Sequence, residues 1–194
     1  VTITGHDVHP GYTKDKMINA IRAAASLIDH LDKDFLPETT EEREPYLHPI
    51  KLDEGDVNGT KVTFIVRAFT EKELHEQEDF LRATITQVEK IFPGIKIEME
   101  IKEGYRNMKT ILDQHPEVMA NAFEALRRQG IEPVCKPIRG GTDGAELCRK
   151  GLPTPNLFAG GRNFHSVFEW VPLDDMVAST ECIVQLAIVC AETN

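Results

Sequence analysis

The sequence lacks an excess of positive charge. Its 194 residues include 22 Lys and Arg against 32 Asp and Glu, which gives a net charge of -10. Nucleic acids and anionic membranes are bound chiefly through clustered Lys and Arg, so neither is expected as the main partner of this chain. The sequence also lacks an unbroken apolar run of the roughly 20 residues that cross a bilayer, and a basic segment followed by an apolar one. Nothing in it predicts insertion into a membrane.

Cysteine is scarce and shows no pattern. There is no CxxC pair and no companion His at the spacing of a zinc finger. The four cysteines are Cys135, Cys148, Cys182 and Cys190. Small buried thiols in a reducing compartment are the simplest interpretation. We therefore expect a cytoplasmic protein.

An initiator Met is also absent. The first residues, Val1 to Gly5, have the β-branched pattern of a strand that is already under way. We therefore expect the chain to begin within a longer protein. The hydrophobic content of 41% is enough to bury a core of ordinary size, in one large domain or two small ones.

The first part of the chain combines two helical patterns with four strand patterns. Apolar residues recur at helical spacing over 17–31 and again over 71–92. The strand patterns are the opening residues, 46–52, 61–69 and 95–101. Asn58-Gly59 predicts a hairpin between the middle two. This order predicts an α+β domain of the split βαβ type over 1–110, with two helices on one face of a four-stranded antiparallel sheet.

The second part, 111–194, has an α/β pattern with few strands. Helices are expected over 116–129, 143–150 and 173–191, and strands at 134–138 and 156–159. A sheet of two or three strands cannot bury both of its faces. We therefore expect an incomplete α/β segment that needs further strands or another chain.

The turn from Gly5 to Gly11 carries two His and one Asp just before the first helix. His6 and His9 lie three positions apart in an extended segment, so their side chains face opposite sides and only one of them reaches a shared site. His9 is the better candidate for a functional residue. An ordinary surface turn explains the same residues, and that alternative stays open.

Two further segments carry residues suited to a small ligand. Arg106, which Asn107 follows at the end of a predicted strand, can offer its bidentate fork to a carboxylate, or it can be an ordinary solvated Arg. In the turn 139–144, glycines let the backbone approach a ligand, and the helix beyond supplies unsatisfied N–H groups. Capping by Thr142 or Asp143 explains that turn equally well, and its spacing fits neither common nucleotide-binding loop.

His165 lies on a loop a few residues after the predicted strand 156–159. Ligands gather at the carboxyl edge of the sheet in α/β folds, so the position of this His favours a ligand role. The residue type alone does not decide between a ligand and an ordinary loop residue.

Four sequence segments occur in a specific order. They are VHPG with Lys14 and Asn19, then YRNM, then IRGGTDGAEL, and finally GLPTPNLFAGG with Asn163 and His165. Together they resemble the peptidase T family of dizinc exopeptidases, which are tripeptide aminopeptidases, and the resemblance covers essentially the whole chain. In that family a split βαβ lid, also called the dimerisation domain, is inserted into a catalytic domain that binds two zinc ions.

The resemblance implies that the chain is a C-terminal fragment of a zinc-dependent aminopeptidase that releases N-terminal residues from tripeptides. It implies that 1–110 is the lid or dimerisation domain and that 111–194 is the C-terminal segment of the catalytic domain. The partners would then be short peptides, the N-terminal catalytic segment that this chain lacks and, through the lid, a second copy.

The resemblance also implies roles for single residues. His9 would be the catalytic lid His that stabilises the oxyanion of the tetrahedral intermediate without binding zinc, and His165 would be the last zinc ligand. The substrate-binding residues would be Arg106, Asn107, Arg139, Gly141, Thr142 and Asp143. One His cannot hold two zinc ions that need about four ligands each, and the general-base Glu is missing, so the isolated chain is expected to be inactive.

The resemblance has two departures. Arg162 stands where the family often has His, and Ser166-Val167-Phe168 replaces a more Gly-rich, basic stretch, which leaves the substrate preference open. A related dizinc dipeptidase or carboxypeptidase with the same lid explains the same segments. The alternative of a different class is a non-catalytic module that dimerises through its sheet edge or binds an amino acid.

Overall fold

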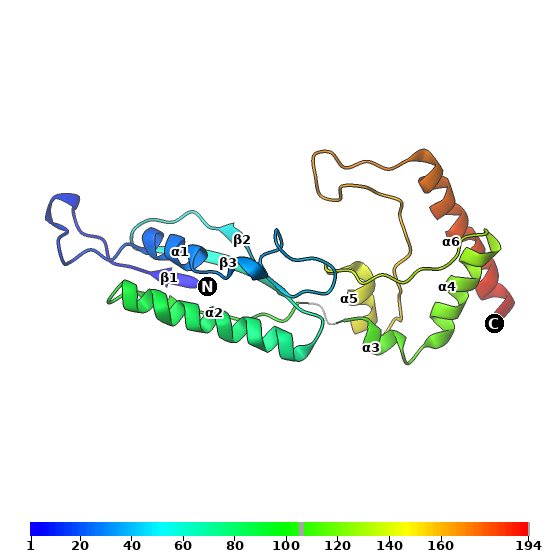
Figure 1. Cartoon of the computed structure of the whole chain (residues 1–194), viewed down its shortest axis with the longest axis horizontal. Helices are drawn as coiled ribbons and strands as arrows, with labels where there is room; N and C mark the ends of the chain where they lie inside the picture. Colours follow the sequence, from blue (N-terminus) through cyan, green and yellow to red (C-terminus); the bar gives the residue numbers. More distant parts are fainter. Residues whose placement is uncertain (105–106, 194) are drawn as a thin grey trace. The chain divides into compact units, whose positions relative to one another are not determined.

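The computed structural model describes residues 1–104 and 107–193, which form two compact units. The first unit runs from Val1 to Glu103, and the second runs from Gly104 to Asn194 (Figure 1). The assignment of these parts to a lid and a catalytic segment concerns function and stays a prediction.

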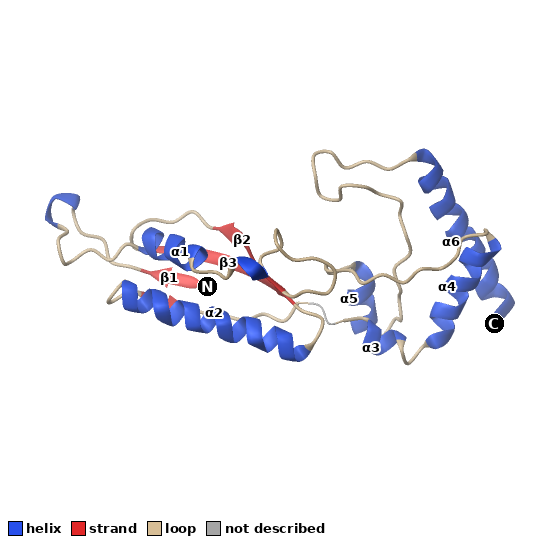
Figure 2. Cartoon of the chain, viewed as in Figure 1, coloured by secondary structure: helices blue, strands red, loops and turns tan. Residues whose placement is uncertain are grey.

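The first unit contains the predicted split βαβ fold (Figure 2). Its elements are β1 (Thr2–Thr4), η1 (Pro10–Tyr12), α1 (Ala20–Asp29), η2 (Lys33–Phe35), β2 (Tyr46–Leu52), β3 (Gly59–Arg67), α2 (Glu71–Ile91) and β4 (Lys96–Glu98), where η is a short 3-10 helix. The four strands pair antiparallel in the order β2-β3-β1-β4. The predicted sheet, hairpin and two helices are confirmed, with β3 two residues earlier and β4 shorter than expected.

Local hydrogen bonds fix the hairpin and the start of α2. The Oγ1 of Thr70 accepts the N–H of Glu73 at 3.2 Å, and a Glu73 carboxylate oxygen accepts the N–H of Thr70 at 3.0 Å, which is a capping box. In the hairpin, Oδ1 of Asp56 accepts the backbone N–H groups of Asn58 at 2.8 Å and Gly59 at 3.2 Å. These bonds hold the pKa of Asp56 below its ordinary value.

The core lies on one face of the sheet. Its fully buried side chains come from β1, β2, β3, α1 and α2 and lie in a single hydrophobic cluster that includes Ile3, Leu47, Val62, Leu27 and Val88. Thr2, the neighbour of Ile3, is exposed, because successive residues of a strand point to opposite faces. Both helices therefore cover the same face of the sheet, as predicted.

The second unit is built mainly from helices. They are α3 (Lys109–Leu112), α4 (Pro116–Arg128), α5 (Asp143–Arg149) and α6 (Leu173–Thr193). An ion pair helps to join α4 to α6: Arg128 lies 2.7 Å from Glu192 and 3.0 Å from Glu124 of its own helix. The hydrogen bond from Arg128 holds the pKa of Glu192 below its ordinary value. The helices expected over 116–129, 143–150 and 173–191 are confirmed.

The prediction of two strands in this unit is wrong. Neither 134–138 nor 156–159 is a β-strand in the structure. Outside the named strands, the pairing in the described part of the second unit is a single antiparallel bridge between Arg162 and Trp170. An apolar segment becomes a strand only when a neighbouring strand satisfies its backbone N–H and C=O groups. The described residues of this unit supply no such neighbour.

Helix α6 leaves most of its apolar surface exposed. By length and composition alone this 21-residue helix is apolar enough to cross a bilayer. Of its most apolar 18-residue stretch, 11% is buried. Such a helix is weak evidence for a membrane span, because a core helix of a larger domain meets the same test. Its first turn also carries Asp174 and Asp175.

All four cysteines are free thiols. Cys148 and Cys182 are buried, as predicted, and burial raises the pKa of the Cys182 thiol. The Sγ of Cys148 accepts the backbone N–H of Thr154 at 3.2 Å. Cys135 is exposed, so the prediction of buried thiols is wrong at that position. It lies in the segment 134–138, which forms no strand.

Candidate functional site

His9 lies in a loop that leaves β1 and returns to α1. The two ends of the loop are joined, because the N–H of His6 donates to the carbonyl of Ile18 at 2.8 Å and the N–H of Ile18 donates to the carbonyl of His6 at 2.9 Å. Gly5 has no room for a side chain, since a Cβ there would overlap the carbonyl oxygens of Ile18 and Val57. The loop is therefore fastened at its base, and His9 lies beyond that base.

Gly5→Ala is expected to destabilise the first unit by about 3 kcal/mol, because the added methyl group collides with two backbone carbonyl groups that are held by hydrogen bonds. Hydrogen exchange at the amides of β1 and β3 measures this loss within the first unit alone. Gly59→Ala is the matched control, since its Cβ would meet only the carbonyl oxygen of Ile3, at 3.5 Å. Equal protection in the two variants would contradict the prediction.

The imidazole of His9 is held in one orientation by its own turn. The N–H of Gly11 donates to Nδ1 of His9 at 3.1 Å, so in the neutral ring the proton is on Nε2. The ring of Tyr12 lies 5.5 Å from the imidazole, with the two planes tilted by 43°. His9 is exposed and therefore presents an N–H donor to solvent. This arrangement suits the stabilisation of an anion better than metal binding, because the free lone pair of the imidazole is already used.

Thr142 organises the turn before α5. Its Oγ1 accepts the N–H of Ala145 at 3.3 Å, which caps the helix. The same oxygen accepts the side-chain N–H of Asn156 at 3.1 Å. Capping by Thr142 is thus confirmed, while Gly141 and Asp143 are exposed beside it.

Asn156 also connects this turn to the segment that contains Asn107. The Nδ2 of Asn156 lies 3.8 Å from the Sδ of Met108. Asn107 is the preceding residue, and its Oδ1 accepts the backbone N–H of Lys109 at 3.0 Å. Through Asn156, the structure brings the predicted substrate-binding segments around Asn107 and Thr142 together.

Two predicted substrate-binding residues remain, Arg139 and Arg106. Arg139 is partly buried in the segment before α5, and Arg106 lies outside the described residues. Sequence reasoning missed Asn156 as a site residue. The signal that could have found it is its place in GLPTPNLFAGG, one of the segments on which the family resemblance rests.

His165 lies in a closed loop with an unusual backbone. The backbones of Arg162 and Trp170 pair at 2.8 and 3.2 Å and close the loop, and the guanidinium of Arg162 lies 2.7 Å from Asp175. His165 has φ 65°, a left-handed conformation that is uncommon outside Gly and Asn. Its N–H donates to a carboxylate oxygen of Glu169 at 2.7 Å, and its side chain is exposed.

The described residues do not form a metal site by themselves. Within residues 1–104 and 107–193, no three His, Cys, Asp or Glu side chains are grouped so that they could hold a metal ion. Protein zinc sites have about four ligands, of which at least three are usually protein side chains. His165 offers one exposed imidazole on a closed loop, so further ligands are needed from outside the described chain.

Known proteins are similar to this chain over most of its residues. A model of the peptidase dimerisation domain matches residues 1–93. Peptidase T of Listeria monocytogenes serotype 4b (strain CLIP80459) is 40% identical over 187 residues, which are 96% of this chain and 45% of that protein. Peptidase T of Bacillus subtilis (strain 168) is 37% identical over the same share of each chain. The chain therefore spans about half the length of the curated relatives it matches.

Solved structures share the fold. Aminopeptidase PepT from Bacillus cereus matches 98% of this chain and 50% of its own, with a TM-score of 0.61 at 19% identity. A tripeptidase from Staphylococcus aureus covers the same shares, with a TM-score of 0.64 at 18% identity. These likenesses confirm the predicted fold of the first unit, a four-stranded antiparallel sheet with two helices. Over nearly all of its residues the chain is similar to peptidase T, and its residues 1–93 match the peptidase dimerisation domain.

Proposed function

We propose that this chain serves as the lid and the C-terminal catalytic segment of a zinc-dependent aminopeptidase that releases N-terminal residues from tripeptides. The observation that carries the proposal is the His9 loop: a fastened turn that presents an Nε2–H donor in a chain similar to peptidase T. The names of the relatives and of the similar tripeptidase support the reaction.

In this proposal His9 stabilises the oxyanion that forms when the peptide carbonyl is attacked. A donor of this kind is most effective when it is oriented before the reaction, because no free energy is then spent on turning it. The bond from the N–H of Gly11 contributes to that orientation by holding Nδ1. The residues proposed to contact the peptide are Arg106, Asn107, Arg139, Gly141, Thr142 and Asp143.

His165 is proposed as a zinc ligand in a site that residues outside this chain complete. Its closed loop and its exposed imidazole support that role. A related solved structure from Bacillus subtilis is described as a dinuclear metal-binding peptidase, which supports metal use at the level of the fold. Bound zinc would polarise the peptide carbonyl and activate water; the role of this chain is to supply one ligand.

The second unit is proposed to pack against the N-terminal catalytic segment found in longer relatives. The exposed apolar face of α6 supports this proposal, with Val177, Ile183 and Val184 each about half exposed. Strands of that segment that pair with 134–138 and 156–159 would also form hydrogen bonds with the backbone N–H and C=O groups of these residues. The four free thiols support a cytoplasmic location, where disulfides are rare.

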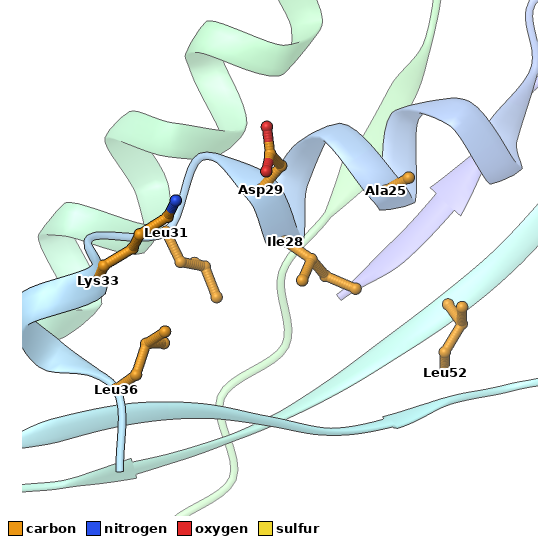
Figure 3. Close-up of a pocket in the computed structure, with 7 residues that line it drawn as sticks. All are labelled: Ala25, Ile28, Asp29, Leu31, Lys33, Leu36 and Leu52. Atoms are coloured by element: carbon orange, nitrogen blue, oxygen red, sulfur yellow. The ribbon is translucent and has the colours of Figure 1, made fainter. Parts of the chain in front are cut away.

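A second copy is proposed to bind at the β2 edge of the sheet. β2 is an end strand of the sheet, and its Ile50 and Leu52 are 46% and 54% exposed. Beside it lies an open apolar cavity of about 420 Å³, whose lining includes Leu52, Ile28 and Leu36 (Figure 3). Edge strands with exposed apolar side chains readily pair with another strand, and the match to a dimerisation domain supports a homodimer.

Ile50→Lys is expected to raise the dissociation constant of the dimer roughly 30-fold, because a charge in the centre of an apolar interface costs about 2 kcal/mol. Sedimentation measured over a range of protein concentrations gives the constant. Ile101→Lys is the matched control, because Ile101 has the same exposure of 46% but lies outside β2. If only the control lost the dimer, or if both variants kept it, the interface would lie elsewhere.

The experiment that tests the proposed reaction is a peptide assay of the full-length gene product. Di-, tri- and tetrapeptides with free and with blocked N-termini are compared, with and without a chelator. Release of the N-terminal residue from free tripeptides, and loss of activity with the chelator, is the expected result. Release of the C-terminal residue favours the carboxypeptidase alternative, and no hydrolysis at all favours a non-catalytic module.

A further inference from the structure

We propose that Tyr12 is a positioning residue that holds the imidazole of His9 in its donor orientation. The inference rests on the proposed role of His9 and extends it to a residue whose side chain has no assigned role. The observation that supports it is the contact of the two rings within one 3-10 turn, with centroids 5.5 Å apart and planes tilted by 43°.

Gly11 restrains the imidazole from the backbone side. Its N–H donates to Nδ1 of His9 at 3.1 Å. A Cβ at Gly11 would lie 3.3 Å from Nδ1 and 3.4 Å from Cε1 of the same ring, which is closer than most real Cβ contacts. The absence of a side chain at this position therefore lets the imidazole lie against the turn. One hydrogen bond at one ring atom still leaves the ring free to tilt about that bond.

Tyr12 supplies the second restraint. Tyr12 is 72% exposed, so packing in a core does not explain the position of its ring. The separation and tilt of the two rings lie within the range at which aromatic side chains attract each other. A hydrogen bond at Nδ1 and a ring contact together fix both the position and the tilt of the imidazole. They thus set the direction in which Nε2–H points.

The chain around the turn supports this function. The N–H of Tyr12 donates to the carbonyl of His9 at 2.8 Å, which ties the backbones of the two residues together. Pro10 stands between them at the start of the 3-10 helix, where its fixed φ is suited to the turn. The ring contact is therefore built on a short, locally bonded backbone.

Tyr12→Leu in the full-length protein is expected to lower kcat about 10-fold with KM changed less than 2-fold, because a poorly directed donor weakens only the transition state. Tyr12→Phe keeps the ring and should retain kcat. In a His9→Ala background, Tyr12→Leu should cause no further loss, since the ring then has no imidazole to hold. A 10-fold loss that persists in that background would overturn the proposal.

A spectroscopic test on this chain does not depend on activity. Nitrogen-15 NMR of the His9 ring should show Nε2 protonated and Nδ1 unprotonated, with proton shifts displaced by the Tyr12 ring. Tyr12→Leu should remove that displacement and broaden the ring signals, because the imidazole can then tilt about its bond to Gly11, and Tyr12→Phe should preserve both signatures. An unchanged His9 spectrum in Tyr12→Leu overturns the positioning role. Unchanged kcat in His9→Ala, with the NMR result as expected, overturns the proposed role of His9 instead.

Discussion

His9→Ala in the full-length protein is expected to lower kcat by about 10²- to 10³-fold, with a much smaller change in KM. Loss of one oriented donor to an oxyanion has an effect of this size, because the donor acts on charge that develops only in the transition state. The structure supplies the orientation through the bond from the N–H of Gly11 to Nδ1 of His9 and the contact with the Tyr12 ring. If the hydrogen bond were already formed in the substrate complex, its loss would instead raise KM.

His6→Ala is the matched control for this measurement. His6 lies in the same loop and is exposed, but its part in the structure is the backbone bridge to Ile18. An Ala retains that bridge, so kcat should stay within a factor of two of the parent value. Equal losses in the two variants would show that the loop as a whole matters and would remove the specific role of the His9 imidazole.

The preference for His9 over His6 shows what a sequence pattern can decide. The alternation of an extended segment indicated that the two side chains do not share a site. It could not indicate that Gly11 donates to one imidazole nitrogen, because that bond depends on the 3-10 turn formed by Pro10 to Tyr12. The sequence makes His9 a candidate, and only the structure indicates its tautomer.

The first unit could be predicted because its strands and helices are completed within the same chain. Each strand there has a neighbour in the same unit, so the backbone N–H and C=O groups of β1 and β3 are satisfied by pairing with each other. The segments 134–138 and 156–159 carry comparable apolar residues and form no strand. Sheet formation is a property of neighbours as well as of composition, and these two segments have none among the described residues of the second unit.

The contact of Asn156 with Thr142 could not be predicted from spacing. Fourteen positions separate them, and no periodicity relates the two. The contact arises because a Cβ-free Gly144 lets the chain at Thr154 and Asn156 approach the first turn of α5, where a Cβ would come within 2.7 Å of the Thr154 carbonyl oxygen. Close backbone approach of this kind leaves only a glycine in the sequence as its sign.

His165→Gly is expected to remove most of the activity of the full-length protein and to weaken metal binding at least 100-fold. Loss of an outer partner of a ligand already costs 10- to 100-fold in affinity, and loss of a ligand costs more. Gly is the suitable replacement because His165 has φ 65°, where Ala would add backbone strain of its own. Metal content measured by mass spectrometry after dialysis reports the effect without reference to turnover.

His115→Gly serves as the control, since His115 is a partly exposed residue of the same unit whose Nδ1 lies 3.2 Å from Glu117. Its metal content and kcat should match those of the parent. The 194-residue chain alone should bind zinc weakly and hydrolyse no tripeptide, because the described residues hold no group of three ligands. Full metal content in His165→Gly would exclude a ligand role for His165. Its loop, closed between Arg162 and Trp170, would then need an explanation other than the presentation of an imidazole to a metal.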